Sequence, residues 1–253
     1  MIKLVISGCC GKMGKRIIAL ALADKEFKLV GAIENKGHPA IGKKINEILH
    51  LSASDIKITD NLDIIKKADA LIEFTSPLAT AEHLGLAAEY KKAIVIGTTG
   101  LDIRQVSQIK KASSQIPIVF SPNMSVGVNL VFRLVKELSR QLGKDYQADI
   151  VEAHHIQKKD APSGTAKRLA ELIKQSSGRK KVNIKSIREG GIVGDHQVRF
   201  ESGQDAIVIK HSAKTRDIFA QGALEAARFA VRQKPGLYDM QDVITDRKVM
   251  EKR

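Results

Sequence analysis

Apolar and polar positions along the first half of the chain follow a regular succession of strand and helix patterns. Short apolar runs at residues 2–7, 28–33, 70–74, 93–97 and 116–121 predict strands. Longer amphipathic stretches at residues 11–23, 77–90 and 102–114 predict helices between them. Strands and helices in this order predict an α/β domain with a doubly wound parallel sheet.

The pattern changes after a further helix predicted at residues 126–143. Strands are expected at residues 150–154, 183–188, 197–201 and 206–210, with one helix at residues 164–176. This succession predicts a second, α+β domain with a mixed or antiparallel sheet. The last predicted helix, residues 219–233, has a face of small side chains suited to close packing on a sheet, and we expect it to return to the first domain.

A glycine-rich turn joins the first predicted strand to the first predicted helix. It consists of Gly8, Cys9, Cys10, Gly11, Lys12, Met13 and Gly14. Such a turn lets the backbone approach a pyrophosphate, whose charge the free N–H groups at the helix start can bind. Cys10 stands where a middle glycine is usual, so the motif alone also fits a turn without a ligand.

Glu34 strengthens the interpretation of this turn as a dinucleotide site of the Rossmann type. It ends the second predicted strand, where an acidic side chain can accept hydrogen bonds from the ribose hydroxyls of adenosine. The strand, glycine turn, helix, strand and acid occur in the order that this site requires. We therefore predict binding of NADH or NADPH.

Two later loops follow the fourth and fifth predicted strands. They consist of Gly97, Thr98 and Thr99, and of Ser121, Pro122, Asn123 and Met124. Ligands of open parallel sheets bind at the carboxyl ends of the strands. We expect both loops to lie along the nicotinamide half of the cofactor, although such residues also serve turn geometry alone.

Residues 152–166 combine groups for proton transfer with groups for anion binding. Adjacent histidines, His154 and His155, precede Lys158 in a polar loop. The loop leads to a helix start at Gly164 and Thr165, whose N–H groups can bind a carboxylate. The spacing of histidines and cysteines does not favour a metal site.

Composition limits the partners and the location that we expect. The net charge is +14, but the lysines are dispersed and aromatic residues make up only 4%, so we predict no nucleic-acid partner. The basic run at residues 178–181 is expected to be a loop. The first apolar run is too short for a signal peptide, and no segment has the length of a membrane span. The two cysteines are adjacent and cannot form the usual disulfide between distant segments, which fits a reducing compartment. We therefore expect a cytoplasmic protein.

The segment 152–166 resembles the E-A-H-H-x-x-K-x-D-A-P-S-G-T-A motif of the dihydrodipicolinate reductase family, also called 4-hydroxy-tetrahydrodipicolinate reductases, of lysine biosynthesis. Residues 8–14, 74–77, 95–100, 123–129, 192–196 and 236–240 also resemble family segments, in the same order. The resemblance covers nearly the whole chain. It implies reduction of a small cyclic dicarboxylate, 4-hydroxy-tetrahydrodipicolinate, to tetrahydrodipicolinate.

The resemblance also implies a role for each part of the chain. His154 would donate the proton, Lys158 would be the second catalytic group, and His155, Gly164 and Thr165 would contact the substrate. The cofactor contacts would be Gly8, Cys9, Cys10, Gly11, Lys12, Met13, Glu34, Gly97, Thr98, Thr99, Ser121, Pro122, Asn123 and Met124. Residues 1–125, joined by 218–253, would bind the dinucleotide, and residues 126–217 would bind substrate and form a homotetramer.

Two positions depart from the family pattern. Cys10 replaces a common glycine, and Asn35 stands where some members carry an arginine that favours NADPH. The second departure leaves the preference between NADH and NADPH open. Another two-domain dehydrogenase of amino-acid metabolism would share the first domain, but the double-histidine segment argues against it. A nucleotide-responsive regulator or DNA-binding protein would need a helix-turn-helix or a concentrated basic face, and the sequence shows neither clearly.

Overall fold

The computed structural model describes residues 1–49 and 54–250. The chain divides into two compact units. The first unit combines Met1–Ser125 with Phe219–Arg253, and the second is Val126–Ile218. No helix among the described residues is both long and apolar enough to cross a membrane.

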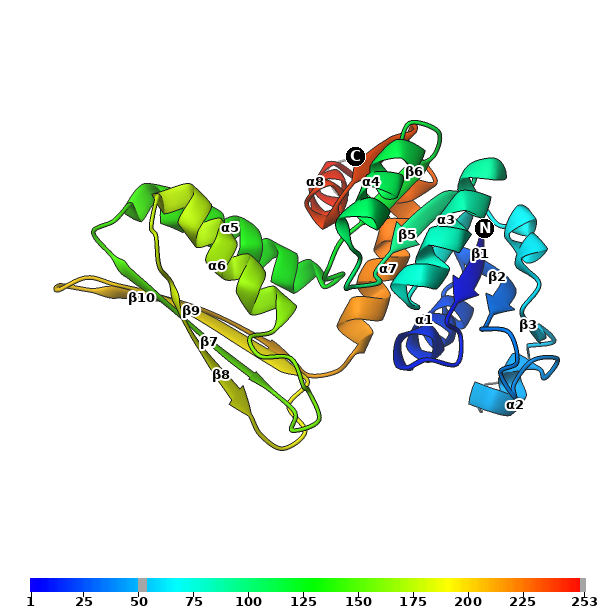
Figure 1. Cartoon of the computed structure of the whole chain (residues 1–253), viewed down its shortest axis with the longest axis horizontal. Coiled ribbons are helices and arrows are strands. Elements are labelled where there is room, and N and C mark those ends of the chain that lie inside the picture. Colours follow the sequence, from blue (N-terminus) through cyan, green and yellow to red (C-terminus); the bar gives the residue numbers. More distant parts are fainter. Residues whose placement is uncertain (50–53, 251–253) are drawn as a thin grey trace. The chain divides into compact units, whose positions relative to one another are not determined.

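The first unit contains a seven-stranded sheet in which every pair of neighbouring strands is parallel. Its strands are β1 (Ile2–Ser7), β2 (Phe27–Ile33), β3 (Ile58–Thr59), β4 (Ala70–Glu73), β5 (Ala93–Ile96), β6 (Pro117–Phe120) and β11 (Gly236–Tyr238). Their order across the sheet is β11-β6-β5-β4-β1-β2-β3. Figure 1 labels β6, β5, β1, β2 and β3 in this order. This arrangement confirms the predicted Rossmann-type sheet.

Helices cover both faces of this sheet (Figure 1). The helices of this unit are α1 (Lys12–Ala23), α2 (Ile45–Leu49), the 3-10 helix η1 (Leu62–Lys67), α3 (Pro77–Glu89), α4 (Ile103–Ala112), α7 (Asp217–Ala230) and α8 (Met240–Met250). The starts of two helices follow from local sequence. Ser76 caps α3 before Pro77, and Asp102 and Gln105 form a reciprocal capping box at the start of α4.

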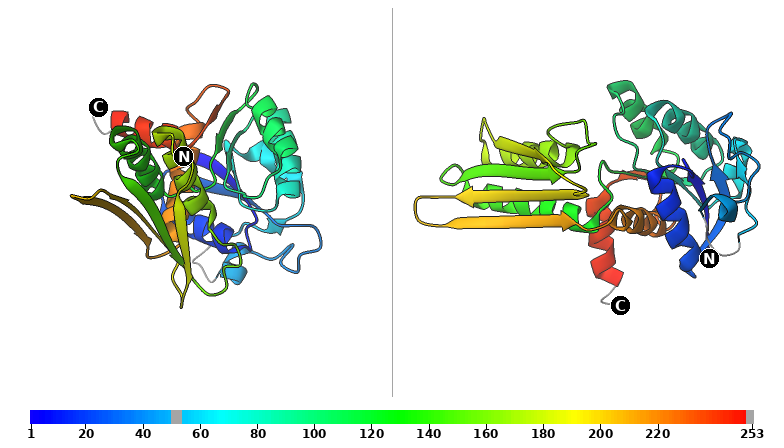
Figure 2. Two further views of the ribbon diagram at one scale, coloured as in Figure 1. Left: turned by 60° about the vertical axis from the view of Figure 1, so that its left-hand side comes forward. Right: turned by 90° about the horizontal axis from the view of Figure 1, so that it is seen from below.

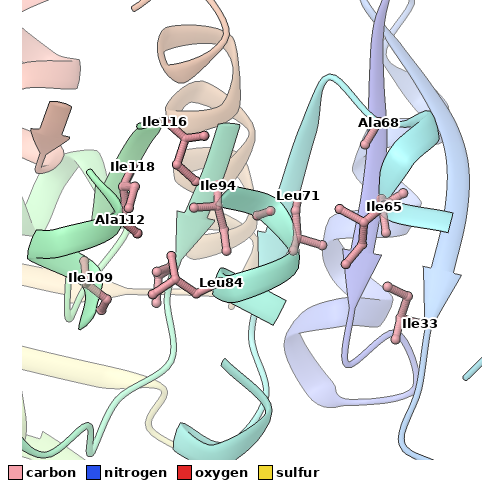
Figure 3. Close-up of a cluster of buried hydrophobic side chains, with 13 residues drawn as sticks. Ile33, Ile65, Ala68, Leu71, Leu84, Ile94, Ile109, Ala112, Ile116 and Ile118 are labelled. Atoms are coloured by element: carbon pink, nitrogen blue, oxygen red, sulfur yellow. The ribbon is translucent and has the colours of Figure 1, made fainter. Parts of the chain in front are cut away.

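The core of the first unit lies between the strands and helices α3, α4 and η1. Leu71 and Ile94 from the sheet pack with Leu84 of α3 and Ile109 of α4, all of them buried (Figure 3). The strands are apolar on both faces because helices cover both sides of a parallel sheet. This packing fixes the strand ends from which the candidate cofactor loops emerge.

The opposite side of the sheet carries α1 and α7. The alanine face predicted for the last helix is buried, and Gly222 on α7 approaches the chain so closely that a Cβ atom there would lie 1.8 Å from the carbonyl oxygen of Met124. Arg228 of α7 forms ion pairs with Asp24 and Glu26, just beyond the end of α1. Small side chains therefore let α7 pack tightly within this unit.

The second unit has a mixed four-stranded sheet covered on one face by two helices (Figure 2). Its elements are α5 (Val126–Leu142), β7 (Gln147–His154), α6 (Gly164–Ser177), β8 (Asn183–Arg188), β9 (Gly194–Glu201) and β10 (Ala206–Ala213). The strand order is β10-β9-β7-β8, with only the β7–β8 pair parallel. The predicted α+β domain is confirmed, and of the two alternatives, mixed or antiparallel, the sheet is mixed.

Some boundaries differ from the sequence prediction. Strands β7, β9 and β10 are each longer than expected, because polar residues continue the ladder beyond the apolar run. Strands β3 and β11 were missed, since two or three residues establish no period. The basic segment 178–181 is a loop, as predicted, and begins at Gly178, which ends α6 with a φ of 68°.

Candidate active site

The turn between β1 and α1 has a geometry that requires glycine at two positions. Gly8 has a φ of +72°, and a Cβ atom there would lie 2.5 Å from the carbonyl oxygen of Phe74. At Gly14 a Cβ atom would lie 2.1 Å from the carbonyl oxygen of Gly8. The turn thus brings the backbone close to the first helix without the usual middle glycine. Gly11 precedes α1 and provides no side-chain cap, so the first N–H groups of the helix can bind an anion.

Glu34 is joined directly to this turn. One of its carboxylate oxygens accepts the N–H of Cys10 at 2.9 Å, and the other accepts the N–H of Asn35 at 3.0 Å. An ionised carboxylate has about four lone-pair sites, so it can accept further hydrogen bonds. The structure therefore brings together the turn and the acid that the sequence predicted to act as one site.

A cavity of about 590 Å³ lies beside the turn and Glu34. Gly8 and Gly11 line it from the turn, and Asn35 and Lys36 line it beyond β2. Its volume is in the range of small-molecule sites, and it lies at the carboxyl ends of β1, β2 and β4. A second cavity of the same volume lies at the other end of the sheet, near Ile2, Ala93 and Pro117, where this fold does not bind nucleotides.

The later loops differ in how they meet this site. At Gly97 a Cβ atom would lie 2.2 Å from the ring of Phe74, and Thr98 accepts the N–H of Thr75 at 3.1 Å. Gly97 and Thr98 thus support the wall of the cavity, while Thr99 is exposed. Ser121–Met124 folds into a turn of its own, in which the hydroxyl of Ser121 donates to the carbonyl oxygen of Asn123 at 2.9 Å.

In the second unit, His154 and Glu152 form a buried pair at the end of β7. Nδ1 of His154 is hydrogen-bonded to the Glu152 carboxylate, and the side chains are 9% and 0% exposed. Burial lowers the pKa of His154, against the opposing effect of Glu152. Burial alone would raise the pKa of Glu152, but its hydrogen bonds, first of all from Arg188, hold that pKa below its ordinary value.

His196 on β9 packs edge-on against His154, with ring centroids 5.1 Å apart. Burial lowers the pKa of His196 to about 4, so this ring is neutral at neutral pH. Its Nε2 lies 3.1 Å from the hydroxyl of Ser163. On the other side, a Cβ atom at Gly194 would lie 3.1 Å from Nε2 of His154. A side chain at position 194 would therefore crowd the nitrogen that does not face Glu152.

Arg188 of β8 connects the buried pair to the polar loop. Its guanidinium donates to the Glu152 carboxylate at 2.9 Å and to the carbonyl oxygens of Lys158 at 3.2 Å and Asp160 at 2.5 Å. The Lys158 ammonium is itself 2.7 Å from the Asp160 carboxylate, and this contact holds the pKa of Asp160 below its ordinary value. Lys158 thus carries a carboxylate partner within the loop, and its charge is one of the lesser influences that lower the pKa of His154.

The loop ends at the start of α6, where Ser163 caps the helix and accepts the N–H of Ala166 at 3.2 Å. Gly164 has open space around its Cα, and Thr165 is half-buried. The cap thus satisfies the Ala166 N–H of this first turn. His155 follows β7, and its main-chain N–H donates to Ile192 at 2.7 Å. His154, Lys158 and the helix start therefore lie along one loop of the second unit.

Four residues of this site had no role in the sequence prediction: Glu152, Arg188, His196 and Asp160. Glu152 and Asp160 stood inside the quoted motif, and the alternation of β7 places Glu152 and His154 on one face. The two-residue spacing could therefore have indicated Glu152 as a partner of His154. Arg188 and His196 become neighbours only through the pairing of β8 and β9 with β7.

Two groups of side chains in the described residues have ligand atoms close enough for a metal ion. They are Cys9 with Cys10 and Glu34, and Glu152 with His154 and His196. In both groups the carboxylate oxygens already accept hydrogen bonds from the protein. Burial also raises the pKa values of both thiols, which disfavours the thiolate that a metal needs.

Comparison with known proteins links both units to one family. A family model described as dihydrodipicolinate reductase, N-terminus, matches residues 2–124, and one described as dihydrodipicolinate reductase, C-terminus, matches residues 127–244. The 4-hydroxy-tetrahydrodipicolinate reductase of Syntrophus aciditrophicus (strain SB) is 42% identical over 264 residues, covering 96% of this chain and 98% of that protein. The enzyme of that name from Geotalea uraniireducens (strain Rf4) is 40% identical, and the match covers 96% of this chain and 99% of that protein.

Solved structures agree with this fold. Dipicolinate-bound dihydrodipicolinate reductase from Paenisporosarcina sp. TG-14 superposes with a TM-score of 0.79 at 24% identity, covering 94% of this chain and 97% of that one. An amine dehydrogenase from Mycobacterium smegmatis superposes with a TM-score of 0.63 at 10% identity, covering 93% and 94%. The second likeness reflects the architecture that many dehydrogenases share.

Proposed function

The chain belongs to the dihydrodipicolinate reductase family, and we propose that its His154 and Lys158 carry out the reaction of that family. The reaction is the NAD(P)H-dependent reduction of 4-hydroxy-tetrahydrodipicolinate to tetrahydrodipicolinate in the diaminopimelate and lysine pathway. One hydride and one proton enter the ring, and one water molecule leaves. The observation that carries the residue assignment is the buried Glu152–His154 pair, whose second histidine nitrogen a Cβ atom at position 194 would crowd.

The first unit fits a nicotinamide dinucleotide. A cradle that Cβ atoms at Gly8 and Gly14 would fill, an uncapped helix start and a carboxylate lie together beside a cavity of suitable size. The bound nicotinamide supplies the hydride. The residues that would hold the dinucleotide are Gly8, Cys9, Cys10, Gly11, Lys12, Met13, Glu34, Gly97, Thr98, Thr99, Ser121, Pro122, Asn123 and Met124.

Lys158 and the start of α6 would bind the dicarboxylate. Charge-assisted hydrogen bonds from an ammonium to a carboxylate are roughly twice as strong as neutral ones, and N–H groups at a helix start favour an anion. The Lys158 ammonium already holds the Asp160 carboxylate, at 2.7 and 2.8 Å. A substrate carboxylate would replace that partner, with Gly164, Thr165 and His155 as the other contacts.

His154 would donate the proton through Nε2. An ionised carboxylate only accepts hydrogen bonds, so the Nδ1 atom that faces Glu152 carries a hydrogen and the exchangeable proton belongs on Nε2. Burial disfavours the doubly protonated ring. A bound dianion favours it, so substrate binding and proton uptake are coupled. Lys158 would stabilise the negative charge that develops on the ring.

The assignment of tasks to the two units follows from these sites. The first unit, with residues 1–125 and 218–253, would bind the cofactor, and residues 126–217 would bind substrate and associate into a homotetramer. Strand β10 is an edge strand with Val208 about half-exposed, which suits association between sheets. A tetramer in the cytoplasm completes the proposal. Sedimentation equilibrium tests it, and a monomer at micromolar concentration would contradict the association.

The activity is tested by following the loss of NADH or NADPH absorbance with freshly formed 4-hydroxy-tetrahydrodipicolinate as the other reactant. We expect oxidation that depends on both reactants and stops without the dicarboxylate. Absence of oxidation with either cofactor, in protein that is folded by circular dichroism, would exclude the activity. Dipicolinate, the ligand named in the related structure, serves as a competitor that cannot be turned over in this assay.

A further inference from the structure

A buried polar cluster lies at the carboxyl ends of β1 and β4. Its members are Ser7, Glu73, Thr80, His83 and Thr98, whose exposed fractions range from 0% to 5%. Glu73, Thr80 and His83 have no part in the mechanism above. Polar groups buried to this degree require partners, and ionisable ones are costly to bury. Their position beneath the candidate cofactor cavity requires a physical account.

Glu73 is the centre of the cluster. One carboxylate oxygen lies 2.7 Å from Nδ1 of His83, which therefore carries a hydrogen, and the same nitrogen lies 3.2 Å from the hydroxyl of Ser7. The other carboxylate oxygen accepts hydrogen bonds from the hydroxyls of Thr75 and Thr80. A single carboxylate at the end of β4 thus fixes donors from α3 and from the loop between β4 and α3.

Thr98 extends the cluster to the loop after β5. The hydroxyl groups of Thr80 and Thr98 are hydrogen-bonded to each other at 2.9 Å, and the Thr98 oxygen also accepts the N–H of Thr75 at 3.1 Å. Thr75 and Thr98 are therefore each linked to Glu73, one directly and one through Thr80. The loops after β4 and β5 are held to each other by this network.

The loop after β4 forms a wall of the cofactor cavity, and the loop after β5 supports it from behind. The lining of the cavity includes Phe74, Thr75 and Ser76 of this loop, together with Ser7 of β1 and His83 of α3. The wall is tightly packed. A Cβ atom at Gly8 would lie 2.5 Å from the Phe74 carbonyl oxygen, and a Cβ atom at Gly97 would lie 2.2 Å from the Phe74 ring. A displacement of Phe74 would therefore disturb both glycine loops. The network beneath Phe74 determines where this wall lies.

Stability alone does not account for a buried Glu–His pair. Well-packed apolar side chains of similar volume stabilise a core at least as well as a buried ionic pair does. A carboxylate differs in that it accepts hydrogen bonds from several donors at fixed directions. That property suits a group that must hold two loops in one geometry.

We propose that Glu73 and His83 are positioning residues of the cofactor site, which hold Thr75 and Thr98 in the geometry that binds NADH and NADPH. The proposal rests on the proposed function, since it assigns the cavity of the first unit to the cofactor. It predicts that breaking the network weakens cofactor binding and leaves dicarboxylate binding in the second unit unchanged.

The test compares matched variants of the full chain. Thr80→Val keeps the side-chain shape and removes the hydroxyl, Thr80→Ser restores the hydroxyl, and His83→Gln removes the partner of Glu73. Glu89→Gln, on an exposed position of the same helix, controls for a change of charge on α3. NADH and NADPH binding is measured by fluorescence titration, dipicolinate binding by calorimetry, and folding by circular dichroism and Tm.

We expect the dissociation constants for both cofactors to rise about two- to tenfold in Thr80→Val, the range of one hydrogen bond, and more in His83→Gln. Thr80→Ser should bind as the native protein does, and dipicolinate binding should stay within twofold in all variants. Folded Thr80→Val and His83→Gln proteins with native cofactor affinity would overturn the proposal. If His83→Gln fails to fold, the Thr80 pair decides. A native protein that binds neither cofactor would contradict the proposed function instead.

Discussion

Glu152 and His154 extend from the same face of β7, and the Glu152 carboxylate accepts a hydrogen bond from Nδ1 of His154. Alternation along a strand makes this pairing possible, because residues two apart share a face. Arg188 neutralises the carboxylate from the next strand. The acid therefore stays ionised although buried, and it fixes which nitrogen of His154 is available to a ligand.

Replacement of either proposed catalytic side chain should reduce turnover strongly. We expect His154→Ala and Lys158→Ala each to lower kcat by about 10²–10⁴, the range for loss of a general acid, with cofactor affinity nearly unchanged. Steady-state kinetics with both cofactors, together with NADH titration of each variant, measure this. If both variants keep most of their turnover, the proton comes from another group.

The orienting acid provides a second, separable prediction. Glu152→Gln keeps the shape of the side chain but can present its amide to Nδ1, which favours a hydrogen on Nε2 and disturbs protonation of the ring. We expect kcat to fall by about 10², at the lower end of the range for general-acid loss. Tm should also fall, because Arg188 loses an ionic partner. A Glu152→Gln enzyme with native kcat and native pH profile would show that Glu152 does not orient His154.

Stability should depend on pH through His196. Burial lowers the pKa of His196 to about 4 from 6.5, so between these values the unfolded chain binds more protons than the folded one. Stability therefore rises with pH across this window and is lost as the pH falls from 6.5 towards 4. Each pKa unit corresponds to about 1.4 kcal/mol, so the contribution is about 3 kcal/mol.

Urea unfolding at a series of pH values between 4 and 7 measures this dependence. In His196→Gln the side chain no longer titrates. The slope of the unfolding free energy against pH should therefore be smaller, by the amount that corresponds to about one bound proton between pH 4 and 6.5. His154 and His211 have pKa values lowered in the same direction, which leaves a residual slope. Equal slopes in the native and variant proteins would mean that His196 is not the buried neutral group inferred here.

Asp160 should compete with substrate for Lys158. The pair is partly exposed, with side chains 24% and 56% accessible, and such pairs contribute about 0–1 kcal/mol. Asp160→Asn removes the competing charge, so dipicolinate should bind up to about fivefold more tightly. Calorimetry at low and high salt measures this, and the gain should shrink at high salt because screening weakens exposed charges. Asp160→Glu, which keeps the charge, is the control, and weaker binding in Asp160→Asn would contradict the competition.

The first unit could be predicted from the sequence in most of its features. Apolar runs and glycine spacing are local signals, and they indicated five strands, the turn at Gly8 and the role of Glu34 as part of one site. The strands that were missed, β3 and β11, contain two and three residues, and they exist only because longer neighbours pair with them. Local patterns carry no information about such pairing.

The second unit shows the same limit at the candidate site. The motif at residues 152–166 indicated His154 and Lys158 directly. Arg188 and His196 lie far along the chain and reach His154 only through the register of β8 and β9 with β7. The buried Glu73–His83 pair of the first unit was missed for a similar reason, because its ten-residue separation spans a strand, a loop and a helix.

We expect cofactor preference to depend on Glu34, Asn35 and Lys36, which follow β2, and of these Glu34 is held by two main-chain hydrogen bonds. Its carboxylate is held by the N–H groups of Cys10 and Asn35, so it stays where the 2′-position of the adenosine ribose is expected. There it would accept a hydrogen bond from the 2′-hydroxyl of NADH and would repel the 2′-phosphate of NADPH. Lys36 lines the same cavity with an exposed charge, and an ion pair there contributes only about 0–1 kcal/mol.

We therefore expect both cofactors to support the reaction, with NADH equal or modestly favoured. Asn35 also lines the cavity but lacks the planar guanidinium that binds a phosphate through two parallel hydrogen bonds. Asn35→Arg should shift the ratio of kcat/KM values towards NADPH, and Lys36→Gln should shift it towards NADH. Because each change acts on the 2′-phosphate alone, kcat with saturating cofactor should remain near the native value. A strong native preference for NADPH would refute the role assigned to Glu34.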